Sequence, residues 1–266
     1  MKRWIPFVKT PPVVPVIALR GTITMAGRAA SLNDFGLGPM IERAFKRGKP
    51  AAVALVINSP GGSPVQSSLI AARIRRLADE KKIPVFAFVE DVAASGGYWL
   101  ATAADEIWVD PSSVVGSIGV ISSGFGFQEL IGRYGVERRV HTAGKSKSTL
   151  DPFKPEKAAD VKMLNALLTQ MHETFIGQVK GRRGSKLADS SKLFSGEFWL
   201  GQASVDLGLS DGIGHLIPKM KERFGDDVRF VPYNQKRPIL QRFGVRLMEE
   251  TMAGVEERAQ FARFGL

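Results

Sequence analysis

Short apolar segments alternate along this chain with longer segments of helical spacing, and this alternation limits the fold more than any other sequence feature. Segments rich in β-branched residues predict strands at Val13–Leu19, Val53–Asn58, Val85–Val89 and Glu106–Val109. Between the second and third of these, Pro64–Lys81 places its apolar residues at helical spacing. Strands that alternate with helices predict βαβ units, and therefore an α/β fold with a parallel sheet and flanking helices.

Four further segments complete the predicted order of elements. Ser31–Arg47 is expected to form a helix with a glycine-interrupted start, and Lys157–Lys180 predicts the longest helix, with one apolar stripe. Val114–Ile121 is expected to be a glycine-containing strand or a turn-rich segment, and Val136–His141 a short strand. These elements extend the α/β pattern along most of the chain.

The sequence predicts one main domain followed by a short appendage. A chain of 266 residues can bury a sizeable core, and this one shows no internal repeat and no low-complexity linker. The dipeptide at 237–238, Arg-Pro, is the best candidate for a boundary. We therefore expect residues 1–237 to form one domain and residues 238–266, whose apolar residues recur at helical spacing, to form a helical appendage.

Composition excludes several classes of function. The chain contains no cysteine, which rules out disulfides, thiolate metal sites and cysteine nucleophiles. Its formal net charge is +11, but the basic residues are spread along the chain without a nucleic-acid-binding motif, so we expect no nucleic-acid partner. No stretch reaches the roughly 20 apolar residues of a membrane-spanning helix, and no signal peptide is recognisable.

Ser95 stands in a segment whose composition suits an exposed catalytic serine. Asp91–Tyr98 reads DVAASGGY, follows a predicted strand and enters a predicted helix. Its small residues permit a tight turn that exposes the hydroxyl, as a nucleophile elbow requires, and the Gly96 N–H at the helix start could bind an oxyanion. A serine that merely caps the helix explains the pattern about as well.

A second glycine-rich turn strengthens the catalytic interpretation. The segment NSPGG at 58–62 stands at the carboxyl end of a predicted parallel strand, where α/β folds bind ligands. Gly61 and Gly62 would let the backbone approach a substrate and direct N–H groups at a developing oxyanion. An ordinary turn accounts for the same residues equally well.

Few residues of the chain are candidates for the general base that would activate Ser95. His172 and His215 lie in or beside predicted helices, and His141 is a weaker competitor near the lysine-rich segment 143–148. A Ser-His-Asp triad is therefore poorly supported, and no His, Asp or Glu pair has metal-ligand spacing, so no metal or cofactor is expected. A lysine can serve as the base if its surroundings keep it neutral. Lys145 and Lys147 are the candidates, and both could equally be exposed loop lysines.

Five segments together resemble the signal peptide peptidase A family of serine peptidases, and they follow the family's order. The resemblance covers about residues 13–217, and its specificity comes from the combination rather than from any single motif. The segments are INSPGGS at 57–63, EDVAASGGYWLA at 90–101, DPSSVVGSIGV at 110–120, AGKSKSTLDPF at 143–153 and FSGEFWLGQASVDLGLSDGIG at 194–214.

The resemblance implies a ClpP/crotonase-like fold and peptide-bond hydrolysis by a Ser/Lys dyad through an acyl-enzyme. Ser95 takes the place of the nucleophile, and Lys147 takes the place of the general base. Lys145 stands where the family varies and receives no role. Ser117 matches a serine that hydrogen-bonds the lysine amine and would help to orient it.

The resemblance also implies an oxyanion hole and an assembly. Backbone N–H groups of Gly96 and of either Gly61 or Gly62 would form the hole. Family members with two copies of the unit take Ser and Lys from different repeats, so this single copy is expected to form a homo-oligomeric ring that shares its dyads and acts on peptides. The family's membrane anchor is not seen, so we expect a location in the cytoplasm or peripheral association with the inner membrane.

Two other functions share the expected fold. A crotonase-like acyl-CoA enzyme would use an oxyanion hole of backbone amides without a Ser/Lys pair, and the full series of motifs fits it badly. A non-catalytic scaffold would keep the fold without turnover, whereas Ser95, Ser117 and Lys147 are all present. For the peptidase, the substrates could be cleaved signal peptides, membrane-protein fragments or unfolded chains.

Overall fold

The chain forms two compact units, of which the first, Met1–Ile118 with Ile176–Leu266, is built around an eight-stranded sheet. The second unit is Gly119–Phe175. The computed structural model describes residues 11–25, 31–144, 146–235 and 258–266. The predicted boundary at Pro238 and most of the predicted appendage 238–266 therefore lie outside the described residues.

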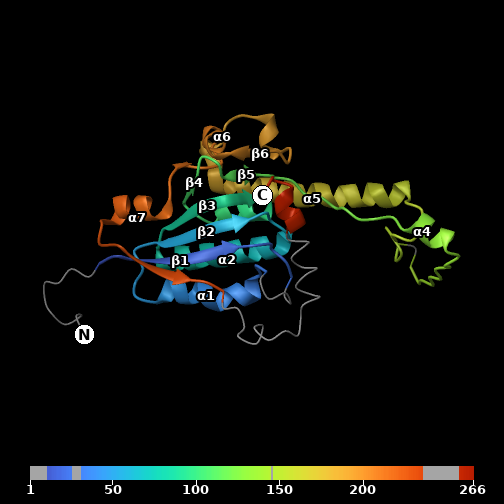
Figure 1. Cartoon of the computed structure of the whole chain (residues 1–266), viewed down its shortest axis with the longest axis horizontal. Coiled ribbons are helices and arrows are strands. Elements are labelled where there is room, and N and C mark those ends of the chain that lie inside the picture. The colour runs from blue at the N-terminus through green and yellow to red at the C-terminus, as the bar shows by residue number, and fades with distance from the viewer. Residues whose placement is uncertain (1–10, 26–30, 145, 236–257) are drawn as a thin grey trace. The chain divides into compact units, whose positions relative to one another are not determined.

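The sheet consists mainly of parallel strands, which confirms the α/β prediction. Its main path runs β6–β5–β3–β2–β1–β8, and β4 pairs with both β3 and β7 (Figure 1). β5 and β6 run antiparallel, and the other described pairs are parallel. The strands are β1 (Val13–Arg20), β2 (Val53–Ser59), β3 (Val85–Ala94), β4 (Glu106–Val109), β5 (Val114–Gly116), β6 (Phe198–Leu200), β7 (Gly212–Ile213) and β8 (Arg229–Tyr233).

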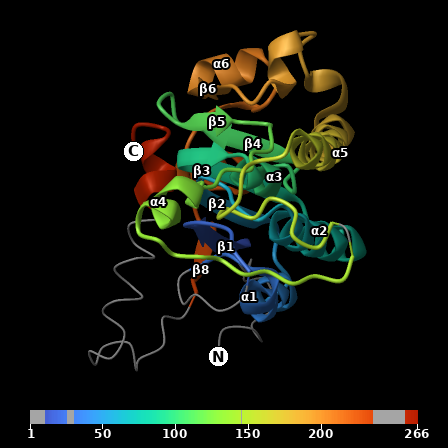
Figure 2. The same ribbon diagram turned by 90° about the vertical axis from the view of Figure 1, so that its right-hand side faces the viewer.

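Two helices, α1 (Asp34–Lys46) and α2 (Pro64–Lys81), lie on the same side of the sheet (Figure 2). The Asn33 side chain accepts the Gly36 N–H at the start of α1, and Ser63 accepts the Gln66 N–H at the start of α2. Side chains alternate along a strand, so one face of β1 and β2 presents a single apolar set. Its fully buried members are Ile17, Leu19, Leu55 and Ile57.

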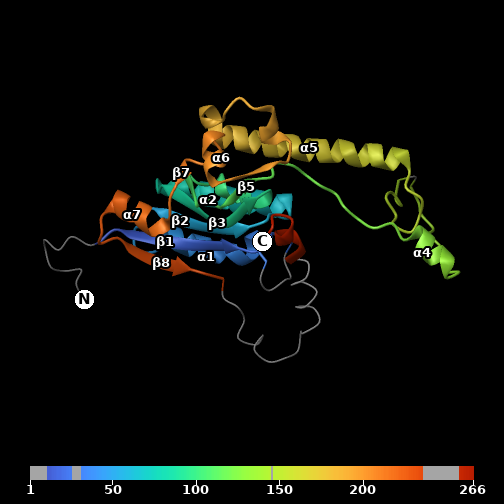
Figure 3. The ribbon, with the colours of Figure 1, turned by 45° about the horizontal axis from the view of Figure 1, so that its top comes forward.

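The opposite face of the sheet is covered at one end by α7 (Leu216–Phe224). Met220 joins a buried cluster with Val14, Ala54 and Phe86, and the rings of Phe86 and Phe224 meet edge to face at 6.3 Å. Figure 3 shows α7 at the end of the sheet where β1 begins. The other helices are α3 (Gly96–Ala101), α4 (Gln128–Arg133), α5 (Ala158–Arg183) and α6 (Gly201–Asp206).

β3 changes its pairing partner part of the way along its length. Its first half pairs with β4 and its last three residues pair with β5. Between them, Glu90 and Asp91 form a bulge, because Ile57 of β2 lies opposite Val89 while Ser59 lies opposite Ala93. The bulge lets β3 continue to Ala94, five residues beyond the predicted strand end.

The bulge contacts side chains of β2 and of β1, the next strand beyond β2. Arg20 of β1 donates two hydrogen bonds of 2.6 Å to the Glu90 carboxylate. The side-chain amide of Asn58, near the end of β2, donates to Asp91. These contacts hold together the carboxyl ends of β1, β2 and β3, where the two glycine-rich turns leave the sheet.

One sequence prediction is wrong, and another is made more precise. Val136–His141 forms no strand: its residues are mostly exposed, and within the described part of the second unit no strand lies beside it to complete a ladder. Of Val114–Ile121, only Val114–Gly116 forms a strand, because Gly116 and Ser117 both adopt positive φ, at 116° and 52°, and end it.

The predicted longest helix is confirmed as α5, which spans 26 residues. It carries charged residues along its length, from Asp160 in its first turn to Arg183 in its last. None of the helices in the described part of the chain combines the length and the apolar composition that crossing a lipid bilayer demands.

An ion pair joins the end of α5 to the sheet. Arg183, whose side chain is 3% exposed, contacts Asp211 at 2.7 Å, and Asp211 also accepts hydrogen bonds from Lys186 and from the Ile107 N–H of β4. Burial disfavours ionisation of Asp211, but these donors outweigh it and hold the pKa of the carboxyl below its ordinary value. The pair therefore stabilises the fold while Asp211 is ionised.

Replacing Asp211 with asparagine should lower the free energy of unfolding by about 3–5 kcal/mol, because the buried Arg183 charge loses its partner. In the native protein, the lowered pKa contributes stability above the unfolded value of about 3.9, and this contribution is lost as pH falls through the folded pKa. Urea unfolding at pH 7 and at pH 3 measures both effects. Asp226→Asn, at a side chain that is 93% exposed, is the control, and an equal loss in the two variants would contradict the assignment.

Candidate functional site

Ser95 occupies a strained turn between β3 and α3. Its backbone has φ 52° and ψ −122°, a combination that costs a non-glycine residue about 1–3 kcal/mol. Its N–H donates to the Gly116 carbonyl at 2.8 Å, and its half-buried side chain makes no capping hydrogen bond. A capping serine has extended φ and accepts a helix N–H, so the capping interpretation does not fit this geometry.

Two glycine-rich turns pack directly against each other beside Ser95. A side chain on Gly61 would come within 2.8 Å of the Ala94 carbonyl, the Gly96 nitrogen and the Ser95 Cβ. A side chain on Gly97 would stand 2.2 Å from the Ser59 carbonyl. The structure thus brings together the two motifs that the sequence places about 35 residues apart, and glycine is what permits the contact.

Several backbone N–H groups lie where the two turns meet. The Ile23 N–H donates to the Gly61 carbonyl at 2.8 Å, and the Ser63 N–H donates to the Ile23 carbonyl at 2.7 Å, so Ile23 fixes the turn from both sides. Gly61 and Gly62 have φ of 104° and 138°, which only glycine adopts readily. Within the described residues, the N–H groups of Gly62 and Gly96 donate to no protein acceptor, whereas that of Gly61 contacts the Ser59 hydroxyl at 3.3 Å.

Ser117 lies beside this centre. It follows Gly116, whose carbonyl accepts the Ser95 N–H, and its own N–H donates to the Glu197 carbonyl at 2.7 Å. Its φ of 52° turns the chain sharply after β5. Ser95, Ser117 and the glycines of both turns therefore lie close together in the first unit.

Lys147 belongs to the second unit, where its side chain is exposed. Its N–H donates to the Gly144 carbonyl at 3.2 Å in a turn, and Lys145 lies outside the described residues. A lysine base must be kept neutral by its surroundings, so a part of the protein other than this turn has to cover it. The pairing of Ser95 with Lys147 stays a prediction.

Asp151 anchors the segment that carries Lys147. The Phe153 N–H donates to its carboxylate at 3.1 Å and Arg138 contacts it at 3.2 Å, and these two partners hold the pKa of Asp151 below its ordinary value. Its oxygen also accepts from the Ser148 hydroxyl at 3.4 Å. Sequence reasoning missed this role, although the aspartate lies in the same motif, AGKSKSTLDPF, as the lysine.

The described contacts of His141 and His215 include no hydrogen bond to a serine hydroxyl. His215 contacts Asp110 at 2.9 Å, but Ser112 reaches the same carboxylate through its backbone N–H, and the Ser113 hydroxyl donates to the Glu90 carbonyl. His141 lies in the second unit outside any helix or strand. The geometry therefore gives no reason to prefer histidine as the base for Ser95.

Sequence reasoning also missed the contacts that hold the two turns in register. Asn58 and Asp91 are joined by a hydrogen bond, as are Arg20 and Glu90. A signal was available, because Asn58, Glu90 and Asp91 are polar residues that directly follow apolar strand segments. The motif residue Tyr98 is structural instead: its buried hydroxyl donates to the Leu209 carbonyl at 2.8 Å.

Comparison with curated proteins finds similarity to proteases and to one kind of transporter. The chain is 46% identical over 286 residues to the Na(+)/H(+) antiporter NhaA of Brucella melitensis, a match covering 100% of this chain and 39% of that protein. It is 32% identical over 210 residues to "Probable protease SohB" of Haemophilus influenzae, covering 77% of this chain and 58% of that protein. The chain thus spans less than two thirds of the length of these relatives.

A solved structure supports the fold. The membrane-bound stomatin-specific protease 1510-N aligns with a TM-score of 0.51 at 16% identity, over 86% of this chain and 95% of that chain. The model of Peptidase family S49 matches residues 78–222, more than half of the sequence. That range contains Ser95, Ser117 and Lys147. The chain therefore belongs to peptidase family S49.

Proposed function

We propose that this protein is a serine endopeptidase in which Ser95 is the nucleophile and Lys147 the general base. The observation that carries the proposal is the turn at Ser95, whose strained serine has an uncapped side chain and packs directly against Gly61. A peptidase needs a reactive hydroxyl and oxyanion donors within a few ångströms of each other, and this turn supplies both. Membership of a peptidase family supports the reaction class.

The proposed reaction runs through an acyl-enzyme. Neutral Lys147 removes the Ser95 hydroxyl proton as the oxygen attacks the scissile carbonyl carbon. Backbone N–H groups of Gly96 and of the Gly61–Gly62 turn bind the resulting oxyanion. Collapse breaks the C–N bond, and the leaving amine takes the proton from Lys147. A water molecule then attacks the ester, gives its proton to Lys147 and releases the acid, while Ser95 regains a proton.

Two further roles complete the proposal. Ser117 would hydrogen-bond the Lys147 amine and aim it at Ser95, and its place after Gly116, the acceptor of the Ser95 N–H, suits this role. The substrates would be signal peptides or other peptides from membrane proteins or unfolded chains. The alignment of the whole chain with part of an antiporter, which is a membrane protein, supports a substrate derived from membrane proteins.

The active assembly would be a ring of identical subunits that share their dyads. Four large apolar side chains of the second unit are more than half exposed, which leaves an apolar surface that a second copy could cover. Lys147, in the same unit, is exposed as well and needs such a cover to act as a base. The apolar residues are Ile121, Phe125, Tyr134 and Val136.

Replacing Ser95 with alanine should abolish peptide and ester hydrolysis, with a loss of up to about 10⁶ in rate, because no other group forms the acyl-enzyme. A fluorophosphonate probe should label the native protein at Ser95 and leave the variant unlabelled. Ser112→Ala is the matched control, since Ser112 is exposed and its described contacts are with Asp110 rather than with the residues around Ser95. Near-normal hydrolysis by Ser95→Ala would remove Ser95 from the mechanism, and an unlabelled, folded native protein would favour an acyl-CoA enzyme or a scaffold.

Replacing Lys147 with arginine should also abolish hydrolysis, because a guanidinium stays protonated and cannot accept the Ser95 proton. The fold should be retained, since the side chain is exposed in its own unit. Lys145→Arg serves as the control and should keep near-native activity. The measurement is the rate of ester hydrolysis by each variant. An active Lys147→Arg variant together with an inactive Lys145→Arg variant would show that Lys145, not Lys147, is the base.

Mixing Ser95→Ala protein with Lys147→Ala protein, each inactive alone, should restore part of the activity after subunit exchange. Some interfaces would then join an intact Ser95 of one subunit to an intact Lys147 of its neighbour. Ester hydrolysis against mixing ratio is the measurement, and exchange is followed with a fluorescent label on each protein. If subunits exchange and the mixture stays inactive, the dyad lies within one chain.

A further inference from the structure

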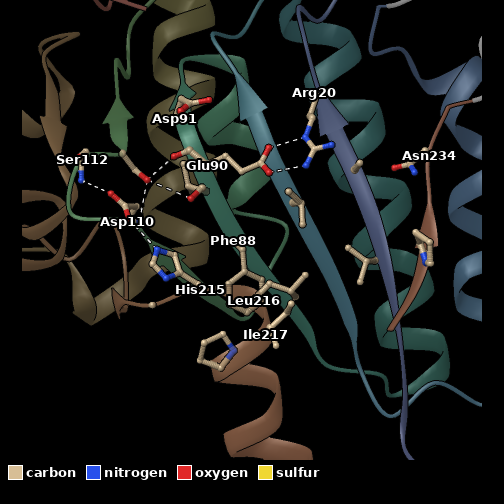
Figure 4. Close-up of a pocket in the computed structure, with 18 of the residues that line it drawn as sticks. Arg20, Phe88, Glu90, Asp91, Asp110, Ser112, His215, Leu216, Ile217 and Asn234 are labelled. Carbon is tan, nitrogen blue, oxygen red and sulfur yellow. Dashed lines mark hydrogen bonds and ion pairs between the residues drawn. The ribbon is translucent and has the colours of Figure 1, made fainter. Parts of the chain in front are cut away.

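A pocket of about 830 Å³ lies over the sheet face that α7 leaves partly uncovered, and the proposed chemistry does not use it. Its floor is formed by alternate residues of neighbouring strands, Val16 and Ala18 of β1, Val56 of β2 and Phe88 of β3. Figure 4 shows His215, Leu216 and Ile217, at the start of α7, beside this floor. The volume falls in the range of about 300–1,000 Å³ that is typical of ligand pockets.

The floor is open because α7 is short. Its buried residue Met220 and its last residue, Phe224, pack on the beginnings of the strands, next to Val14 and Phe86. Further along the same face, Leu216 and Ile217 line the pocket on one side and Pro232 of β8 lines it on the other, and Leu266 also lies at its edge. Ile217 remains 55% exposed. This apolar surface can therefore accept aliphatic groups.

The upper rim of the pocket is acidic. Glu90, Asp91 and Asp110 line it together with a single guanidinium, that of Arg20. Arg20 neutralises Glu90 through two hydrogen bonds of 2.6 Å (Figure 4). Asp91 contacts the uncharged amide of Asn58, so its charge is not cancelled by this partner.

Asp110 adds a second carboxylate that remains negative. It accepts the Ser112 N–H at 2.8 Å and contacts His215 at 2.9 Å, and these bonds hold the pKa of Asp110 below its ordinary value. An acidic rim attracts a cation and repels an anion, which distinguishes between the ligands that an apolar floor could bind.

We propose that this pocket is a second peptide-binding site, which takes aliphatic side chains on its floor and an adjoining lysine or arginine side chain at the Asp91–Asp110 rim. The floor residues Val16, Ala18, Val56 and Phe88 offer only apolar side chains, which suits an aliphatic peptide side chain. Fatty acids and acyl-CoA esters would place a carboxylate or phosphates against the acidic rim, so the rim selects against them. The proposal goes beyond hydrolysis and does not require Ser95 to be the nucleophile.

Binding can be measured on the full-length Ser95→Ala protein, which keeps bound peptides intact. The probes are short amidated peptides of alternating leucine and alanine with one central lysine and a neutral fluorophore, together with the same peptides carrying glutamate. Fluorescence anisotropy should show the lysine peptides binding at least about fivefold more tightly at low salt. Equal binding of the two series would overturn the proposal.

Two variants test whether the peptides bind in this pocket. Asp110→Asn keeps the hydrogen-bond acceptor but removes the charge, and it should narrow the preference for lysine over glutamate to about twofold. Ile217→Gln should weaken the binding of both peptides about fivefold, because it removes an apolar side chain from the pocket wall. The matched controls are Asp226→Asn, at an exposed carboxylate outside the pocket, and Val65→Gln, in the first turn of α2 and 64% exposed. If the controls change binding as much as the pocket variants do, the proposal is wrong.

Other occupants give distinct results. Laurate that binds more tightly than the lysine peptide would identify an acyl-chain site and overturn the proposal. A peptide affinity that falls as protein concentration rises would mean that a second copy covers the pocket, which also overturns it. Hydrolysis by the native protein is measured separately. An inactive native protein with pocket-dependent peptide binding would defeat the proposed function while the binding site stands.

Discussion

The contact between two glycine-rich turns is the constraint on which the candidate site depends. Gly61 lies against Ser95 and Gly96, and Gly97 lies against Ser59, at distances that leave no room for a Cβ atom. The turns follow two adjacent parallel strands, so the sheet brings their starting points together and glycine allows the final approach. The strained backbone of Ser95 can persist because packing on both sides over-determines it.

The bulge in β3 explains how the sheet supports this contact. At Glu90–Asp91 the strand leaves β4 and begins to pair with β5. The change brings Gly116 beside Ser95, where its carbonyl accepts the Ser95 N–H. Arg20 of β1 and Asn58 of β2 bind the two bulged carboxylates, so the ends of three strands share one network. The bulge at Glu90–Asp91 therefore affects two features. It brings β5, and with it Ser117, beside Ser95, and it contributes two carboxylates to the rim of the neighbouring pocket.

The second unit differs from the first in how its side chains pack. In it, Phe127, Phe153 and Arg138 form a cluster, with the two rings 5.6 Å apart and the guanidinium 4.7 Å from the Phe153 ring. Asp151 connects this cluster to the segment that carries Lys147. The unit exposes Lys147 and several large apolar side chains.

The sequence by itself determined the α/β class, the first four strands, the helices α2 and α5, and the two glycine-rich turns. These features follow from local periodicity and from backbone freedom at single residues, which neighbours in the chain dictate. The same local reading was wrong about Val136–His141, since a strand also needs a partner that this segment lacks. Only the tertiary structure decided that Gly61 meets Ser95, that β3 runs past its bulge to Ala94, and that Arg183 pairs with Asp211. Each of these depends on residues far apart in the chain, and no local pattern specifies which distant groups will meet.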